Sequence, residues 1–198
     1  MKKSLYDLTK DDWNTLFPVK LVEYDPAWSH VFENEKGRIQ DVLGYDALRI
    51  EHFGSTSVPG IRAKPYIDIL LEIPDALLFS EDVINKLETL GYVYFKVPER
   101  DGIAAYMSFG KGYNLEGREE QIFHIHMCPK ENVMWQQIQF RDYLRSNQER
   151  AKSYEALKAD LESKFRNDRG AYVLGKTAFI NETLQLAKAL EDQGTAQL

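Results

Sequence analysis

The chain has 198 residues, of which 43% are hydrophobic, and its 25 Lys and Arg against 31 Asp and Glu give a formal net charge of −6. A chain of this length can bury roughly 70% of its unfolded surface, so a globular protein that needs no disulfide stabilisation is expected. The acidic balance argues against nonspecific nucleic-acid binding, because that affinity comes mostly from neutralising phosphates. The single cysteine, Cys128, excludes an internal disulfide and is predicted to be a reduced core thiol.

The N-terminus lacks the apolar region of a secretion signal, and no apolar stretch approaches the roughly 20 residues of a membrane span. We therefore expect a cytoplasmic protein without a membrane partner. No internal repeat or flexible linker divides the chain. The sequence leaves the oligomeric state open.

The first third of the chain predicts two helices and a strand between them. Residues 1–18 read as an N-terminal extension with one helical turn, opened by the capping pair Thr9 and Asp12 and stopped by Pro18. Residues 20–24 read as a short strand. A helix then begins at Asp25 and Pro26 and ends at Gly44, because apolar side chains recur at helical spacing.

The middle of the chain predicts a sheet and the end predicts helices. Strands are expected at residues 47–53, 65–73, 92–97, 103–109 and 121–127, with a helix at 81–91. From residue 131 amphipathic helices follow, broken near Ser146 and at residues 167–170. The fold class is α+β: a core at residues 19–130 with a mixed sheet flanked by helices, and a C-terminal helical part at 131–198 packed on it as one globular unit.

A short turn at residues 54–60, GSTSVPG, separates two predicted strands. It is not a Walker A loop, because five residues separate its glycines and no Lys follows the second, and it lacks the G-x-S-x-G frame of a nucleophile elbow. Gly54 lets the backbone approach a phosphate, and the hydroxyls of Ser55, Thr56 and Ser57 can donate to its oxygens. The alternative is a simple chain reversal at Pro59 and Gly60.

An acidic residue lies inside the next apolar strand. Alternation places Asp68, Leu70 and Glu72 on one face, whereas the other face is wholly apolar. The apolar face is expected to pack on helices. A charge in this setting is unfavourable unless it is paired, hydrogen-bonded or bound to a metal, so the Asp68 face is predicted to border a site, an ion pair or solvent.

Two histidines share one face of the strand at 121–127. His124 and His126 lie ~7 Å apart along the strand and could share an ion, act as a general base or donate to a phosphate. If this strand lies beside Asp68, a His-His-Asp set would favour Zn, Mn or Fe over Mg. The alternative is a pair of histidines held by structural hydrogen bonds.

Three basic residues are candidates for binding phosphate: Lys64 between the turn and Asp68, Arg141 on a predicted helix, and Lys176 before the last helix. For Arg141 and Lys176 the alternative is a solvated helix face.

Several motifs occur in one order over about residues 19–185. They are Leu21-Val22-x-Tyr24-Asp25-Pro26-x-Trp28, Arg49-Ile50-Glu51-His52-x-Gly54-Ser55-Thr56-Ser57-Val58-Pro59-Gly60, Lys64-Pro65-x-Ile67-Asp68-Ile69, His124-x-His126, Phe140-Arg141-Asp142-Tyr143-Leu144-Arg145 and Gly175-Lys176-x-x-Phe179-Ile180. Together they resemble the GrpB family, which is placed in the nucleotidyltransferase superfamily with a DNA polymerase β-like fold.

The resemblance implies a nucleotidyltransferase-like core in which the Gly54-Ser55 turn holds a triphosphate and Asp68 holds Mg²⁺. The superfamily usually has a second acid two residues after the first, where this chain has Leu70. Glu72 lies ~13 Å along the strand from Asp68, too far to share one ion with it.

Three functions that use a phosphorylated substrate or ligand remain open at this point, beside a fourth: a nucleotide-independent interaction protein whose apolar helical tail is the binding surface. The first is transfer of a nucleotidyl group from a nucleoside triphosphate to a small acceptor, with Asp68, His124 and His126 as catalytic and metal-binding residues and a divalent ion, Mg or Mn with Zn as an alternative, as cofactor. The second is a non-catalytic module that binds a nucleotide or another phosphorylated small molecule. The third is a phosphoesterase whose metal is held by the same His and Asp residues.

Overall fold

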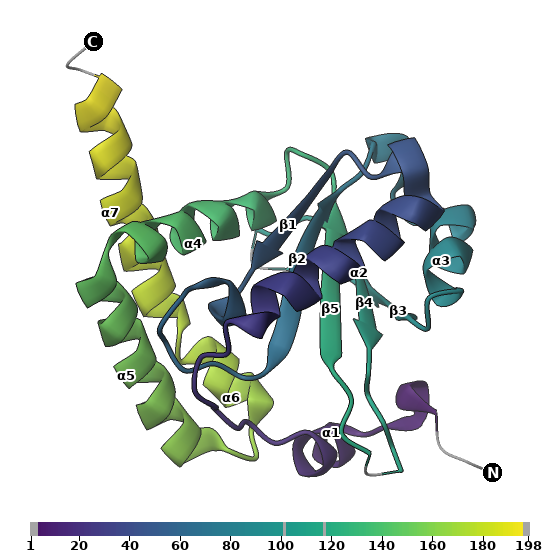
Figure 1. Cartoon of the computed structure of the whole chain (residues 1–198), viewed down its shortest axis with the longest axis horizontal. Coiled ribbons are helices and arrows are strands. Elements are labelled where there is room, and N and C mark those ends of the chain that lie inside the picture. The colour runs from purple at the N-terminus through teal and green to yellow at the C-terminus, as the bar shows by residue number, and fades with distance from the viewer. Residues whose placement is uncertain (1–3, 101, 117, 196–198) are drawn as a thin grey trace. The chain divides into compact units, whose positions relative to one another are not determined.

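The computed structural model describes residues 4–100, 102–116 and 118–195 (Figure 1). The helices are α1 (Lys10–Leu16), α2 (Ala27–Leu43), α3 (Glu81–Glu88), α4 (Gln136–Ser146), α5 (Gln148–Phe165), α6 (Arg169–Leu174) and α7 (Thr177–Thr195). The strands are β1 (Arg49–Phe53), β2 (Tyr66–Glu72), β3 (Val93–Val97), β4 (Tyr106–Lys111) and β5 (Ile122–Cys128). Short 3-10 turns include one at Ser55–Ser57.

The chain forms two compact units. The sheet unit holds residues 25–57 and 65–135, and the helical unit holds the described residues up to Tyr24, residues 58–64 and the chain from Gln136 onward. These limits differ from the predicted boundaries near residues 18 and 130. The reason is that the loop at 58–64 clusters with α4 to α7 although it connects β1 and β2.

The sheet unit is built on a mixed five-stranded sheet of order β1-β2-β5-β4-β3. The central pair, β2 and β5, is parallel, and the other neighbours are antiparallel. This confirms the predicted α+β class with a mixed sheet flanked by helices. The parallel pairing sets Asp68 opposite His124 and Leu70 opposite His126.

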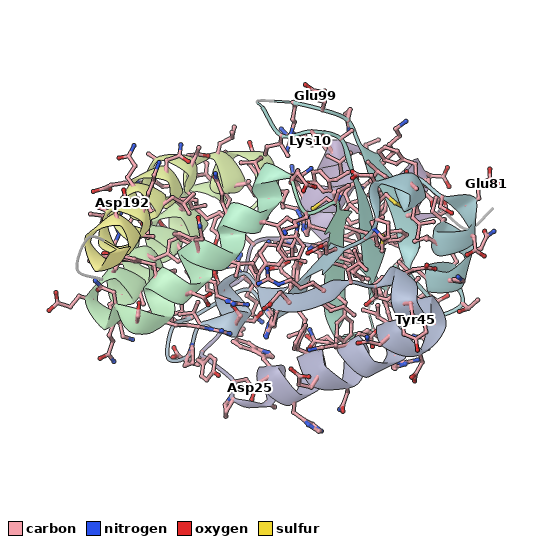
Figure 2. All side chains as sticks on the ribbon, turned by 90° about the horizontal axis from the view of Figure 1, so that it is seen from above. Lys10, Asp25, Tyr45, Glu81, Glu99 and Asp192 are labelled. Atoms are coloured by element: carbon pink, nitrogen blue, oxygen red, sulfur yellow. The ribbon has the colours of Figure 1, made fainter. Side chains whose placement is uncertain are left out.

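Helix α2 covers one face of this sheet, with Asp25 just before its first residue and the exposed Tyr45 just after its last (Figure 2). Phe32 of α2 stacks on His52 of β1, with ring centroids 4.8 Å apart. His52 is opposite Ile69, so the face that packs on α2 is the apolar face of β2, as predicted. The opposite face carries Asp68, His124 and His126.

A buried ion pair joins α2 to the sheet. Glu35 is 4% exposed, and its Oε1 accepts hydrogen bonds from Lys111 Nζ at 2.6 Å and from Tyr92 Oη at 3.0 Å. Burial and the Glu35 carboxylate raise the pKa of Tyr92, so its hydroxyl stays a donor. The buried carboxylate is therefore hydrogen-bonded by the last residue of β4, Lys111, and by the residue just before β3, Tyr92.

The helical unit is held by an apolar cluster to which α4, α5, α7 and the loop at 58–64 contribute. Val58 and Ile61 of that loop pack with Phe140, Leu144 and Tyr154. The predicted breaks near Ser146 and residues 167–170 are confirmed, and each is followed by a side-chain cap: Asn147 before α5 and Asp168 before α6.

The predicted strand at residues 20–24 is wrong. Val22 makes a single bridge with Ala63, in which each backbone amide donates to the other's carbonyl. The neighbouring amide of Leu21 donates instead to the Glu162 carboxylate at 3.1 Å. In an antiparallel ladder that amide points away from the partner segment, so it does not block the pairing. The next hydrogen-bonded pair would join Lys20 to Pro65, and the ladder does not extend because proline has no N–H to donate. Nowhere in the described ranges is a helix both long and apolar enough to cross a membrane.

Candidate functional site

The site lies on the sheet face opposite α2, where the turn after β1 meets β2. Gly54 has a φ of +73°, and a Cβ added there would lie 2.3 Å from Asp68 Oδ2. Only glycine permits this approach, because any side chain would both strain the backbone and displace the carboxylate. The glycine turn and the acidic strand therefore form one site.

The three hydroxyls of the turn have different roles. Thr56 Oγ1 donates to the carbonyl of Tyr66 at 2.8 Å, so it accepts from His52 Nε2 at 3.0 Å. Ser57 Oγ donates to the carbonyl of Gly54 at 2.6 Å. Both hydroxyls hold the turn in shape.

Ser55 is different: among the described residues its half-buried hydroxyl has no hydrogen-bond partner and remains available to a ligand. It also begins the 3-10 turn Ser55–Ser57, in which the amide of Ser57 donates to the carbonyl of Gly54 at 3.2 Å. Of the three predicted phosphate-binding hydroxyls, Ser55 is the one whose proton is not already donated within the protein.

His124 lies between an acid and a phenol. Its Nδ1 is 3.3 Å from Asp68 Oδ1, and its Nε2 is hydrogen-bonded to the hydroxyl of Tyr113. If Tyr113 donates to Nε2, the neutral ring carries its proton on Nδ1, where it faces the carboxylate. The side chains of His124 and Asp68 are 21% and 27% exposed, so solvent or a ligand can reach them.

Tyr113 was missed by the sequence analysis. It follows β4, and its ring lies stacked on His124 at 5.4 Å between centroids, with Tyr66 edge-on to both rings. Gly110, which is opposite His124 in the sheet, leaves room for it: a Cβ at Gly110 would lie 3.0 Å from the Tyr113 ring. A glycine opposite a histidine in the sheet would indicate space for another side chain over that glycine. Recognising the pair from the sequence requires knowing which residues of the two strands are paired.

His126 is more enclosed than His124. Its Nδ1 is buried and has no hydrogen-bond partner among the described residues, and its ring packs against Phe53 and Tyr106 at 5.3 and 5.7 Å. Burial lowers the pKa of His126 to about 4, against the opposing pull of the Asp68 carboxylate. The imidazole is therefore neutral at pH 7, and its orphan nitrogen is a free acceptor or donor within the site.

The predicted divalent ion at Asp68, His124 and His126 stays a prediction. In this arrangement the three residues do not fit an ion, because both nitrogens of His124 face protein partners. Among all described residues, no group of three or more His, Cys, Asp or Glu side chains is placed to hold a metal. No step below runs through a metal ion.

The position of the usual second acid is occupied by a core residue. Leu70 is fully buried and pairs with His126 across the sheet. Glu72, at the far end of β2, lies opposite Cys128 and Arg49. Asp68 is therefore the acidic residue of β2 that lies at the glycine turn.

Two of the predicted basic residues meet in the helical unit. Lys64 Nζ lies 5.8 Å and Lys176 Nζ 4.9 Å from the centroid of the buried Tyr172 ring. Lys158 of α5 joins them: it is 1% exposed, and its Nζ donates to the carbonyl of Arg62. Burial, and secondly the charge of Lys176, lower the pKa of Lys158 to about 7. Three lysines from three segments thus share one region.

Arg141, the third predicted basic residue, is 7% exposed on α4. Its Nε donates to Asp142 Oδ1 at 2.7 Å. The sequence analysis gave a solvated helix face as the alternative to phosphate binding, and that alternative is wrong for Arg141, because its side chain is buried. Phosphate binding by Arg141 stays a prediction.

Comparisons with known proteins agree with one another. A family model described as GrpB protein matches residues 18–186. Glutamate-rich protein GrpB of Alkalihalophilus pseudofirmus is 32% identical over 167 residues, which are 84% of this chain and 94% of that protein. The crystal structure of conserved protein GrpB from Enterococcus faecalis is similar with a TM-score of 0.68 and 30% identity, over 85% of this chain and 96% of that one.

A shorter match joins part of the chain to a larger protein. Over 78 residues, 38% of this chain, it is 35% identical to a dephospho-CoA kinase of Mycolicibacterium paratuberculosis, and the match covers 19% of that protein.

Proposed function

This chain belongs to the GrpB family, and we propose that it is a nucleotidyltransferase-like enzyme that moves a nucleotidyl group from a nucleoside triphosphate to a small acceptor. The observation that carries the proposal is the contact of Gly54 with Asp68 Oδ2, which brings a turn with a free hydroxyl and an acidic strand into one site. Such transfer depends largely on positioning phosphates and balancing their charge.

The residues of the sheet unit divide the work as follows. The amides of the turn and the Ser55 hydroxyl donate to phosphate oxygens, which Gly54 admits close to the backbone. Asp68 orients His124, which acts as the general base once a reacting hydroxyl takes the place of the Tyr113 hydroxyl at Nε2. A divalent ion, if bound with the substrate, would offset phosphate charge.

The lysines of the helical unit are a separate group of candidates for binding a phosphate. Lys64 and Lys176 flank Tyr172, and neither is fully buried, so their ammonium groups can meet an anion. Arg141 is the weaker candidate because its guanidinium is already paired with Asp142.

Leu70 favours a second function, in which the chain binds a nucleotide or another phosphorylated small molecule without turnover. Two acids at positions 68 and 70 could converge on one divalent ion, and a buried leucine removes one of them. The two functions differ in one result: both require binding at the turn, and only the first releases pyrophosphate.

Thermal unfolding with ligands tests the proposal. The panel holds the four common nucleoside triphosphates and, because of the match to a dephospho-CoA kinase, coenzyme A and dephospho-CoA, each with Mg²⁺, Mn²⁺, Zn²⁺ or a chelator. A ligand at a hundredfold excess over its Kd stabilises the folded state by about 2.7 kcal/mol. We expect one nucleotide to raise the melting temperature. Asp68→Asn should keep that rise and slow the release of pyrophosphate, because Asp68 orients His124.

Substitutions of two serines in the turn, Ser55 and Ser57, provide the matched control. Ser55→Ala should weaken nucleotide binding and leave the melting temperature of the free protein unchanged, because the Ser55 hydroxyl has no hydrogen-bond partner in the described part of the chain. Ser57→Ala should lower that melting temperature, because its hydroxyl donates to the Gly54 carbonyl. Equal effects of the two substitutions on binding and on stability would contradict the roles given to these hydroxyls.

A further inference from the structure

Tyr113, His124 and Asp68 form a chain of three groups that the predicted function does not require. A phenol is hydrogen-bonded to one imidazole nitrogen, and a carboxylate faces the other at 3.3 Å. A nucleophile within reach of a base that is itself oriented by a third group is the general arrangement of covalent catalysis, and tyrosine is among the residues that act as nucleophiles.

The setting of Tyr113 fits this role better than that of the other tyrosines nearby. Tyr66 and Tyr106 are buried, at 8% and 9% exposure, whereas Tyr113 is partly exposed and its hydroxyl meets His124. Its ring is held by the stack on His124, the edge of Tyr66 and the space above Gly110. The hydroxyl is therefore fixed at the base and still reachable by a substrate.

We propose that Tyr113 is a covalent nucleophile that takes the nucleotidyl group before it passes to the acceptor. This inference rests on the proposed function, since it uses the same nucleoside triphosphate. It extends that function from direct transfer to transfer in two steps through a nucleotidyl-tyrosine.

In the first step Tyr113 Oη attacks the α-phosphorus. The bond from Oη to phosphorus forms as the bond from that phosphorus to the pyrophosphate oxygen breaks, and pyrophosphate leaves with the electron pair. The phenol proton passes to Nε2 of His124 and on to the departing pyrophosphate. Asp68 stabilises the charged imidazole while it exists.

In the second step an acceptor hydroxyl attacks the same phosphorus. It gives its proton to Nε2 of His124, the bond from phosphorus to Tyr113 Oη breaks, and the phenolate recovers the proton from the imidazole. The sum is nucleoside triphosphate plus acceptor giving nucleotidylated acceptor plus pyrophosphate, with Tyr113 and His124 restored.

Exchange of labelled pyrophosphate into the nucleoside triphosphate tests the first step. A covalent enzyme catalyses this exchange without an acceptor, because the first step is reversible, and it does so even when the intermediate is short-lived. We expect the full-length protein to catalyse it, Tyr113→Phe to abolish it, and His124→Gln to slow it by ~10²- to 10⁴-fold.

Tyr66→Phe is the matched control, since it removes a neighbouring phenol whose ring lies edge-on to Tyr113 at 6.4 Å. It should keep the exchange. In parallel, protein quenched in denaturant after incubation with the nucleotide should carry one added nucleoside monophosphate, and tandem mass spectrometry should place it on Tyr113. Thermal unfolding with the nucleotide shows that each variant is folded and still binds.

Two failures are distinguishable. If the nucleotide binds, and neither exchange nor an adduct on Tyr113 is found, the covalent step is overturned and the proposed function stands as direct transfer or binding. If no nucleotide raises the melting temperature, the proposed function fails and the covalent step fails with it. Exchange that survives in Tyr113→Phe would also overturn the proposal.

Discussion

Glu35 on α2 and Lys111 at the end of β4 form a 2.6 Å ion pair in which the carboxylate is almost fully buried. Tyr92 completes the cluster through its hydroxyl. Removing one member of such a pair leaves the other desolvated, which typically costs about 3–5 kcal/mol.

The first prediction concerns this pair. Glu35→Ala should lower the free energy of unfolding by about 3–5 kcal/mol, measured by urea denaturation at pH 7. Adding Lys111→Met to it removes the unpaired ammonium and should recover part of that loss. Asp82→Ala, which breaks the exposed pair with Lys86, is the control and should change the free energy by at most about 1 kcal/mol. Equal losses at the two sites would contradict the cluster.

The second prediction separates close approach from backbone strain. Gly54 and Gly91 both have positive φ, +73° and +86°, but a Cβ at Gly54 meets Asp68 and one at Gly91 meets nothing within 4 Å. Gly54→Ala should therefore destabilise the fold by about 1–3 kcal/mol more than Gly91→Ala. Chemical denaturation measures the difference, and equal losses would mean that Asp68 moves aside freely.

The third prediction follows from the buried Lys158. Its folded pKa of about 7 lies below the unfolded value of 10.5, so between these values the unfolded chain binds a proton that the folded chain has released. Its contribution to stability rises with pH across that window, by at most about 1.4 kcal/mol per pH unit, and is lost as the pH falls toward 7.

Lys158→Met should abolish this dependence of stability on pH. The difference in stability between the variant and the wild type should therefore favour the variant more at pH 7 than at pH 10. Thermal or urea unfolding at several pH values measures it. Lys164→Met, on the exposed side of the same helix, should leave the slope unchanged. Parallel pH profiles for wild type and Lys158→Met would show that the ammonium is hydrated in the folded protein.

The fourth prediction concerns the orphan nitrogen of His126. The folded pKa of about 4 lies below the unfolded 6.5, so the unfolded chain binds more protons between these values and stability is lost as the pH falls from 6.5 to 4. His126→Phe keeps a ring between Phe53 and Tyr106 and removes the unpaired atom. The variant should lose less stability than the wild type as the pH falls from 6.5 to 4. At pH 7 its free energy of unfolding should equal or exceed that of the wild type.

His30 gives the control for His126, because it lies on the exposed face of α2 with Asn34 as its partner. His30→Gln should leave the acid limb as in wild type. If His126→Phe instead destabilises the protein at pH 7, the orphan nitrogen has a partner in solution, such as a bound water.

Much of the fold is predictable because local pattern decides it. The strand alternation around Ile67, Asp68 and Ile69 gave both the strand and the face that packs on α2, and the capping pair at Thr9 and Asp12 gave the start of α1. The strand at residues 20–24 was wrongly predicted because its partner segment continues with Pro65, which has no N–H for the next pair of the ladder. The local pattern of residues 20–24 does not show which segment they would pair with.

The site was only partly predictable for a similar reason. Alternation placed His124 and Asp68 each on one face of its strand, but their contact depends on the parallel pairing of β2 with β5, which joins distant parts of the chain. Tyr113 lies outside any strand, so no periodicity marks it. Lys158 had a visible signal, because it continues the buried stripe of Tyr154 and Leu161 on α5.

The loop at residues 58–64 limits how the protein can be dissected. It lies between two strands of the sheet unit and packs within the helical unit, so neither unit is a continuous stretch of chain. A fragment ending at Trp135 would retain the whole sheet and would also present Val58 and Ile61 to water without Phe140 and Leu144. Such a fragment should be prone to self-association, so separate production of the two parts calls for a rewritten β1–β2 connection.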